Sequence, residues 1–134
     1  MKDHAAIIIK DGTKILFIKR SQFKKTLPNI WSFPSGTKED YETIYQTAER
    51  ESLEELGIIV KAESLLTIKD LPDFKVKLHF IICSIIDGFP EIKDPSEIQE
   101  LQWLTFKDFF EKYTDSEIGH GLIFLRQQPN LWKG

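Results

Sequence analysis

The chain opens with two runs of apolar and β-branched residues, at positions 4–10 and 14–20, separated by Asp11-Gly12-Thr13. An Asp-Gly pair supplies the positive φ that a tight turn needs, so this pattern predicts a β-hairpin. Residues 30–33 form a shorter apolar piece. It predicts a short strand that enters a turn at Pro34-Ser35-Gly36.

The hydrophobic period changes near residue 41. Residues 42–56 contain neither Gly nor Pro, and their spacing predicts one amphipathic helix. At 3.6 residues per turn, one arc of roughly 80° holds the residues that we expect to be buried, namely Tyr41, Tyr45, Ala48, Ser52 and Leu56. Gly57 stands where a glycine commonly ends a helix.

Predicted strands and helices alternate along the rest of the chain. Residues 58–60 and 65–68 form one long strand or two short ones, and a turn is predicted at Pro72-Asp73. Residues 74–86 end as a continuous apolar run, as expected of a central strand covered on both faces. Three further predictions are a strand at 97–104, a helix from a Thr105/Asp108 capping box to about Tyr113, and a last helix at 116–128 that Pro129 ends. The order favours an α/β fold with helices packed on a mixed sheet.

Composition narrows the class of protein. A chain of 134 residues is about the size of one domain, and its 41% hydrophobic residues supply enough apolar surface for a core. The net charge of −3 is too weak, and of the wrong sign, for an electrostatic grip on polymeric nucleic acid. The apolar stretch 5–9 is too short for a signal peptide or a membrane span, and the single Cys83 reads as an inert core thiol. We therefore expect a soluble cytoplasmic protein.

Three carboxylates are crowded at the C-terminal end of the predicted helix. At 100° per residue, Glu54, Glu51 and Glu55 fall at about −60°, 0° and +40°, so they share one stripe. Like charges at this spacing destabilise a helix by roughly 0.2–0.5 kcal/mol per pair, and anions there also oppose the helix dipole. A hard divalent cation, Mg²⁺ or Mn²⁺, offsets both costs. Taken alone, however, the motif favours an ordinary solvated acidic face.

The residues around this motif change that balance. Gly36, Glu42, Arg50, Glu51, Glu54, Glu55 and Gly57 stand at fixed spacings within residues 36–58. This frame resembles the Nudix box of the Nudix hydrolases, the MutT-like pyrophosphohydrolases. The resemblance implies a single Nudix domain over residues 1–134, folded as an α/β/α sandwich. Two residues depart from the usual pattern: Ser35 replaces a glycine, and Ser52 replaces an aliphatic residue, where we expect its hydroxyl to bond the carbonyl of residue 48.

The resemblance also implies roles for the residues of the box. Four of them are assigned to the cation: Gly36, through its carbonyl, Glu51, Glu54 and Glu55. Glu54 or Glu51 is also the candidate base for the attacking water. Arg50 is expected to point away from the acidic stripe and to orient a glutamate or the loop through ion pairs. Glu42, at the helix start, is expected to be structural.

Outside the box, the resemblance implies one more glutamate ligand from a later segment. We prefer Glu97 to Glu100, and an ordinary surface role for either stays open. Arg20 and Lys24 precede the box. They are candidates for contact with substrate phosphates, with the alternative that they are solvated surface bases.

The expected reaction is Mg²⁺-dependent hydrolysis of a diphosphate linkage in a nucleoside triphosphate or in a nucleoside diphosphate linked to another group. The short chain favours a MutT-like or nucleotide-sugar substrate. The alternative is a catalytically silent Nudix-like module that binds or regulates. Such modules typically lose box glutamates, whereas this chain keeps all of them. The aromatic stretch 123–125 with Trp132 covers either the chain's own sheet or a second copy, so a homodimer stays open.

Overall fold

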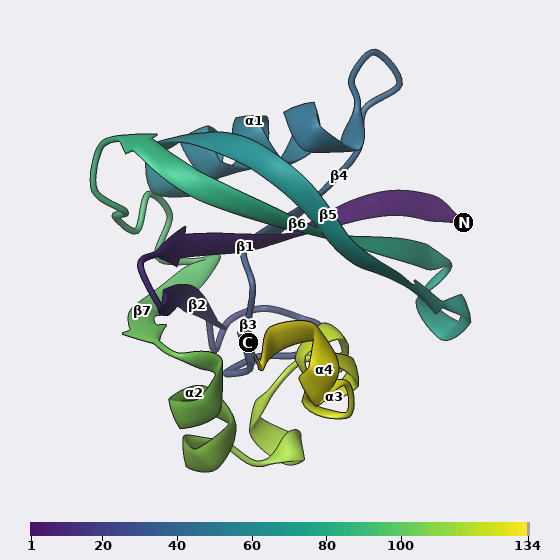
Figure 1. The fold of residues 1–134 in the computed structure, drawn as a ribbon, viewed down its shortest axis with the longest axis vertical. Coiled ribbons are helices and arrows are strands. Elements are labelled where there is room, and N and C mark those ends of the chain that lie inside the picture. The colour runs from purple at the N-terminus through teal and green to yellow at the C-terminus, as the bar shows by residue number, and fades with distance from the viewer. Residues whose placement is uncertain (134) are drawn as a thin grey trace.

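The computed structural model describes residues 1–133. Within them, seven strands form one mixed sheet, with helix α1 on one face and helices α2, α3 and α4 on the other (Figure 1). The elements are β1 (Lys2–Asp11), β2 (Lys14–Arg20), β3 (Trp31–Ser32), β4 (Ser35–Thr37), α1 (Ile44–Leu56), β5 (Ile59–Leu71), β6 (Val76–Asp87), β7 (Ile98–Leu104), α2 (Phe106–Lys112), α3 (His120–Arg126) and α4 (Pro129–Trp132). Single 3₁₀ turns lie at Pro72–Phe74 and Asp115–Glu117. The predicted α/β architecture is confirmed, and none of these helices is long and apolar enough to cross a membrane.

Strand β1 is buried on both faces. Ala5, Ile7 and Ile9 belong to the core beneath α1, whereas Ala6 and Ile8 belong to the core on the side of the C-terminal helices. Successive side chains of a strand point to opposite faces, so an unbroken apolar run is what such a strand requires. On one side β6 pairs with β1 in parallel, and β5 follows at the edge. The central strand predicted at 74–86 is therefore confirmed.

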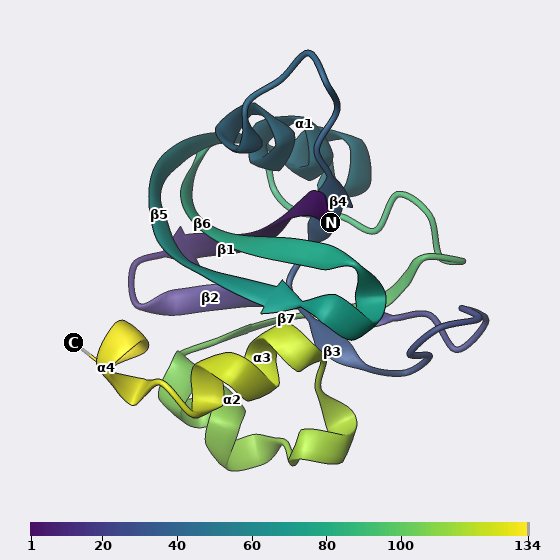
Figure 2. The same cartoon turned by 90° about the vertical axis from the view of Figure 1, so that its right-hand side faces the viewer.

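The sheet divides on the other side of β1. Strand β4 pairs with β1 at residues 4–6, whereas β2 pairs with it only at Lys10 and Asp11, next to the hairpin turn. Strand β2 then pairs along its length with β7 and near its end with β3 (Figure 2). A cleft opens between the diverging strands β2 and β4, against the C-terminal end of α1.

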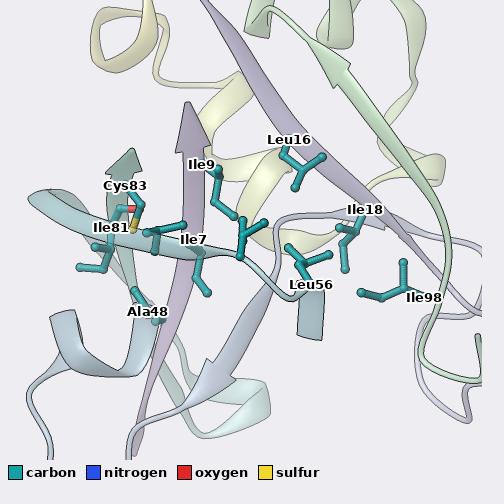
Figure 3. Close-up of a cluster of buried hydrophobic side chains, with 12 residues drawn as sticks. Ile7, Ile9, Leu16, Ile18, Ala48, Leu56, Ile81, Cys83 and Ile98 are labelled. Atoms are coloured by element: carbon teal, nitrogen blue, oxygen red, sulfur yellow. The ribbon is translucent and has the colours of Figure 1, made fainter. Parts of the chain in front are cut away.

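Two apolar cores hold the layers together. Ala48 and Leu56 of α1 pack on the sheet in the first core, where Cys83 is also fully buried (Figure 3). Burial raises the pKa of the Cys83 thiol to about 12, which agrees with an inert core residue. The second core is aromatic, with the rings of Phe17 and Phe109 stacked at 3.8 Å between centroids. Residues 123–125 and Trp132 pack into this core, so they cover the chain's own sheet.

Helix α1 begins at Ile44, two residues later than predicted, because Thr43 caps it. Thr43 Oγ1 accepts a hydrogen bond from the Gln46 amide, and the Gln46 side chain accepts one from the Thr43 amide. Such a capping box is worth about 1 kcal/mol. At the other end Gly57 has a φ of 69°, as predicted for the residue that ends the helix. The Ser52 hydroxyl donates to the Ala48 carbonyl over 2.8 Å, which is also as predicted.

Three local predictions are wrong. Tyr41 is 80% exposed and Tyr45 is 39% exposed, because Thr47 takes the remaining place on the buried face of α1. Residues 35–37 are a strand and not a turn, since pairing with β1 satisfies their backbone. The tail is not one helix: it is divided into a 3₁₀ turn, α3 and α4. Pro129 begins α4, because proline fits the first helical turn, where an N–H has no partner within the helix.

Substitution of Ser52 tests the packing of α1 on the sheet. The side chain is fully buried and its hydroxyl is already bonded. We expect Ser52→Ala to change the free energy of unfolding by less than about 1 kcal/mol. Ser52→Leu forces extra volume into a filled core and should destabilise the fold by about 1–3 kcal/mol. Urea unfolding measures both values. A leucine variant as stable as wild type would show that this part of the core has unfilled space.

Candidate active site

The cleft between β2 and β4 has a volume of about 250 Å³ and is lined by side chains from both branches of the sheet and from α1. Its charged lining residues are Arg20, Glu54, Glu55, Lys93, Asp94 and Glu97. The structure therefore brings together Glu54, Glu55, Glu97 and Arg20, four of the residues singled out in the sequence. Glu100 does not line this cleft and pairs with Lys19 in the register of β7 on β2.

The segment 88–97 carries Asp94 and Glu97 to the end of α1. The Glu91 amide donates to the Leu56 carbonyl over 3.0 Å, so it satisfies one of the last carbonyls of the helix. The amides of Glu97 and Ile98 both donate to the Asp94 carbonyl, which closes a tight turn before β7. These backbone contacts fix two acids from a distant part of the chain beside the helical ones.

Arg50 holds the acidic face of α1 in place. Its Nε and Nη2 donate to the two oxygens of Glu42 over 3.0 and 2.7 Å, and Nη2 also donates to the Thr37 carbonyl over 3.1 Å. On the other side, Nη1 donates to Glu51 Oε1 over 2.8 Å and to Glu54 Oε2 over 3.2 Å. The expected ion pairs are present. The expectation that Arg50 points away from the acidic stripe is wrong, because its guanidinium spans the space between Glu42 and the stripe.

Glu42 is almost completely buried beneath the loop that precedes α1. Besides the Arg50 pair, its Oε1 accepts hydrogen bonds from the Glu39 amide over 3.0 Å and from the Thr47 hydroxyl over 2.9 Å. The Arg50 hydrogen bond lowers the pKa of Glu42 to about 2 against the opposing effect of burial, and the Glu39 amide and Thr47 add to the lowering. Glu42 is thus a charged anchor for Arg50.

Gly36 makes room for Glu51. A Cβ atom at position 36 would lie 2.2 Å from Glu51 Cδ, closer than any two such atoms approach. The Glu51 side chain is consequently held between Gly36 and Arg50, and it is only 15% exposed. Residue 36 must therefore be a glycine because the Glu51 side chain approaches it so closely. This requirement is separate from the expected binding of a cation by the Gly36 carbonyl.

Glu55 bears the main electrostatic cost of the cluster. Burial, followed by the neighbouring charges of Glu51, Glu97 and Glu54, raises the pKa of its carboxyl to about 8. A carboxyl surrounded by other carboxylates in a partly buried place gains from any cation that joins them. The donor set, all of it oxygen, fits a hard divalent cation.

The carboxylates do not form a ready-made cage. No three His, Cys, Asp or Glu side chains within residues 1–133 are grouped closely enough to enclose a metal ion. Glu51 and Glu54 each turn an oxygen toward Arg50 instead. Magnesium commonly takes only one or two carboxylates and keeps several waters, so this open arrangement still suits it.

A second cleft, of about 340 Å³, adjoins the first and shares Arg20, Ser32 and Ser35 with it. Most of its other lining residues are apolar, and His4, Thr26 and His120 are the polar exceptions. Within residues 1–133 no acid lines this second cleft. The sequence did not predict the second cleft, because its lining residues come from elements far apart in the chain. Lys93 and Asp94 of the first cleft were not predicted either. The position of Asp94, three residues before Glu97, was the one local sign that Asp94 belongs to the site.

Replacement of Glu42 tests the Arg50 network. The pKa of Glu42 is about 2 in the folded chain and near 4.5 in the unfolded chain, so its contribution to stability is complete above pH 4.5 and is lost as pH falls through 2. At pH 7 we expect Glu42→Gln to lower the free energy of unfolding by about 3 kcal/mol. Urea unfolding at several pH values should show the variant and the wild type converging toward pH 2. Glu39→Gln, from the same loop, is the control and should match wild type.

Glu55 should affect stability in the opposite sense. Its folded pKa of about 8 lies above the unfolded value of 4.5, so the stability of the protein in EDTA should fall as pH rises from 4.5 to 8. Glu55→Gln removes that fall and should melt at a higher temperature than wild type at pH 8. Thermal unfolding in EDTA at pH 5 and pH 8 measures the difference, with Glu111→Gln as the control. A Glu55→Gln protein less stable than wild type at pH 8 would contradict the crowding of charge.

Comparison with known proteins agrees with this geometry. The NUDIX domain model matches residues 2–124. An 8-oxo-dGTP diphosphatase from Buchnera aphidicola is 41% identical over 79 residues, which cover 58% of this chain and 61% of that protein. An ADP-ribose pyrophosphatase from Methanocaldococcus jannaschii is 31% identical over 114 residues, which cover 82% of this chain and 65% of that protein. The chain thus spans less than two thirds of the length of either relative.

Solved structures resemble the chain over more of its length. A NUDIX hydrolase from Nitrosomonas europaea matches with a TM-score of 0.69 and 25% identity, covering 87% of this chain and 62% of that chain. A second structure from the same organism matches with a TM-score of 0.76 over 96% of this chain and 87% of that chain, and its 19% identity shows the shared fold alone. The box residues, the arrangement of the acidic cleft and the match of the family model over residues 2–124 together establish that this chain belongs to the NUDIX family.

Proposed function

We propose that this chain is a Mg²⁺-dependent pyrophosphohydrolase that cleaves a diphosphate linkage in a nucleoside triphosphate or in a nucleoside diphosphate linked to another group. The observation that carries the proposal is the convergence of Glu54, Glu55 and Glu97 on one cleft beside Arg20. Clustered acids next to a fixed guanidinium suit a polyanion that arrives with a divalent cation. Mn²⁺ is expected to replace Mg²⁺.

The two adjoining clefts suggest how a substrate lies. The acidic cleft suits the diphosphate and its cation, while the more apolar second cleft suits the organic group. Arg20, which lines both, is then placed at the phosphates near the junction. A nucleobase is the organic group that we favour, since named relatives act on nucleotide derivatives. We place the protein in the cytoplasm and leave a homodimer open.

The residues of the box divide the chemistry among them. A bound divalent cation supplies neutralisation of the phosphate oxygens and lowers the pKa of the attacking water. We assign Glu51, Glu54, Glu55, Glu97 and the Gly36 carbonyl to holding it.

Glu54 is our choice for the base. Its side chain is 58% exposed and lines the cleft, whereas Glu51 is enclosed by Gly36 and Arg50. A carboxylate that reaches the cleft can accept the proton of the attacking water. Arg50 acts as a positioning residue, because it holds Glu51 and Glu54 without lining the cleft itself.

A substrate panel tests the proposed function. The purified protein is incubated with nucleoside triphosphates, 8-oxo-dGTP, ADP-ribose and nucleotide sugars, with Mg²⁺ or with EDTA, and the phosphorylated products are identified by chromatography. We expect Mg²⁺-dependent cleavage of at least one class. Silence across the panel, combined with tight binding of a nucleotide, would favour the module without turnover.

Glu54→Gln tests the assigned base. Loss of a catalytic group at a metal-assisted site should lower kcat by at least about 100-fold while the fold is retained. Glu111→Gln, an exposed glutamate on α2 paired with Lys107, should keep wild-type turnover. Steady-state kinetics on the best panel substrate, with melting temperatures for both variants, gives the answer. Undiminished turnover in Glu54→Gln would remove this residue from the mechanism.

A further inference from the structure

The loop 21–29 joins β2 to β3 and lies beside the segment that carries Glu97 (Figure 2). Its base is fixed to β7 and to the residue before it by side-chain and backbone hydrogen bonds. The Ser21 amide donates to the Glu97 carbonyl over 3.0 Å. The Gln99 side chain accepts from the Gln22 amide over 2.9 Å and donates to Asn29 Oδ1 over 3.1 Å, so it ties together both arms of the loop.

Arg20 fixes the far side of the same loop. Its Nη2 donates to the Thr26 carbonyl over 2.8 Å, and its Nε donates to the Leu27 carbonyl over 3.1 Å. The backbone there is left-handed, with φ of 48° at Leu27 and 60° at Asn29. Asparagine tolerates this conformation, whereas Leu27 adopts it only because surrounding contacts impose it. Arg20 is thus engaged in shaping the loop.

Lys24 extends from this fixed loop to the acidic cleft. Its Nζ lies 2.5 Å from Glu97 Oε2. Glu97 lines the cleft with Glu54 and Glu55, and its charge contributes to the raised pKa of Glu55. The carboxylate that we assign to a cation is therefore bonded to a lysine of the protein itself. An ammonium group on Glu97 Oε2 repels a divalent cation that binds the same carboxylate, so the two compete for Glu97.

We infer that Lys24 exchanges partners during the catalytic cycle. Lys24 neutralises Glu97 in the absence of a cation. With a cation held by Glu97, the ammonium group of Lys24 would be released to bond an oxygen of the bound diphosphate. The exchange is one ion pair for another, and no covalent bond changes. Lys24 suits this role because its ammonium is a single charge on a flexible four-carbon stem. Arg20 already uses its Nε and Nη2 for two loop carbonyls, so only its Nη1 is left for the phosphates.

One consequence is cooperative binding. The cation frees Lys24 for the diphosphate, and a diphosphate that holds Lys24 leaves Glu97 open to the cation. Each ligand therefore raises the affinity for the other by the same factor, as linkage requires. This inference rests on the proposed function for the identity of the anion, but the competition between Lys24 and a cation can be measured without turnover.

The first experiment measures Mn²⁺ affinity by titration calorimetry without any phosphate. Lys24→Gln removes the competitor and should tighten Mn²⁺ binding about two- to fivefold, the range for a partly exposed ion pair. In the Glu97→Gln background the same substitution should leave the affinity unchanged. This double-mutant cycle separates competition for Glu97 from a general effect of the lysine's positive charge on Mn²⁺ affinity. Lys25→Gln, a neighbouring lysine of the same loop, is the control and should match wild type.

The second experiment measures the affinity for inorganic imidodiphosphate, a diphosphate that cannot be hydrolysed at its bridge, in saturating Mn²⁺. Lys24→Gln should weaken this binding about tenfold, the scale of one lost charge-assisted hydrogen bond. In EDTA, where Glu97 retains the lysine, wild type and variant should bind equally weakly. Lys25→Gln should again match wild type, and melting temperatures confirm that every variant is folded.

Exchange predicts that Lys24→Gln raises the affinity for Mn²⁺ and lowers the affinity for imidodiphosphate. A Lys24→Gln protein that binds Mn²⁺ no more tightly than wild type overturns the inference, and so does one with wild-type affinity for imidodiphosphate. An effect on Mn²⁺ that persists in the Glu97→Gln background overturns it as well. If the substrate panel is silent, the proposed hydrolysis fails, yet these binding measurements still decide the exchange.

Discussion

The acidic end of α1 depends on a single guanidinium. Arg50 bonds Glu42 on one side and Glu51 and Glu54 on the other, and its Nη2 also bonds the Thr37 carbonyl. It therefore connects the loop before the helix to the acidic stripe and compensates part of the repulsion that several carboxylates create. What it does not reach is Glu55, whose pKa is raised to about 8. Glu55, the carboxyl that no basic side chain compensates in this network, thus lies where the proposed chemistry needs a cation.

The fold places this stripe at an opening in the sheet. A strand buried on both faces, β1, gives a rigid centre, and β2 and β4 diverge from it because each pairs with a different end of the strand. The divergence leaves space for two adjoining clefts of opposite character, one acidic and one mostly apolar. A substrate with a charged and an uncharged half fits such a division.

Local periodicity made much of the fold predictable. The hairpin, the helix with its Gly57 end, the bond from Ser52 to the Ala48 carbonyl and the central strand were all accessible from spacing within a few residues. The short elements could not be predicted from local spacing. Residues 35–37 form a strand only because β1 offers them partners, and the tail divides at positions that tertiary packing decides.

The candidate site was predictable only in part for a related reason. The box glutamates lie within one turn of each other, so helical geometry places them together. Glu97 and Lys24 lie 73 positions apart, and no pattern in the sequence announces their contact. The second cleft likewise collects residues from strands, loops and α3. Such contacts depend on topology, which single-sequence spacing does not encode.

The proposed function requires the crowded carboxylates to hold a divalent cation. The most direct test is a crystal structure of the wild-type protein grown with Mn²⁺, with an anomalous difference map calculated around α1. We expect an anomalous peak within about 2.3 Å of oxygens from at least two of Glu51, Glu54, Glu55 and Glu97. A fully occupied Mn²⁺ elsewhere, with these four side chains turned to solvent, would contradict it.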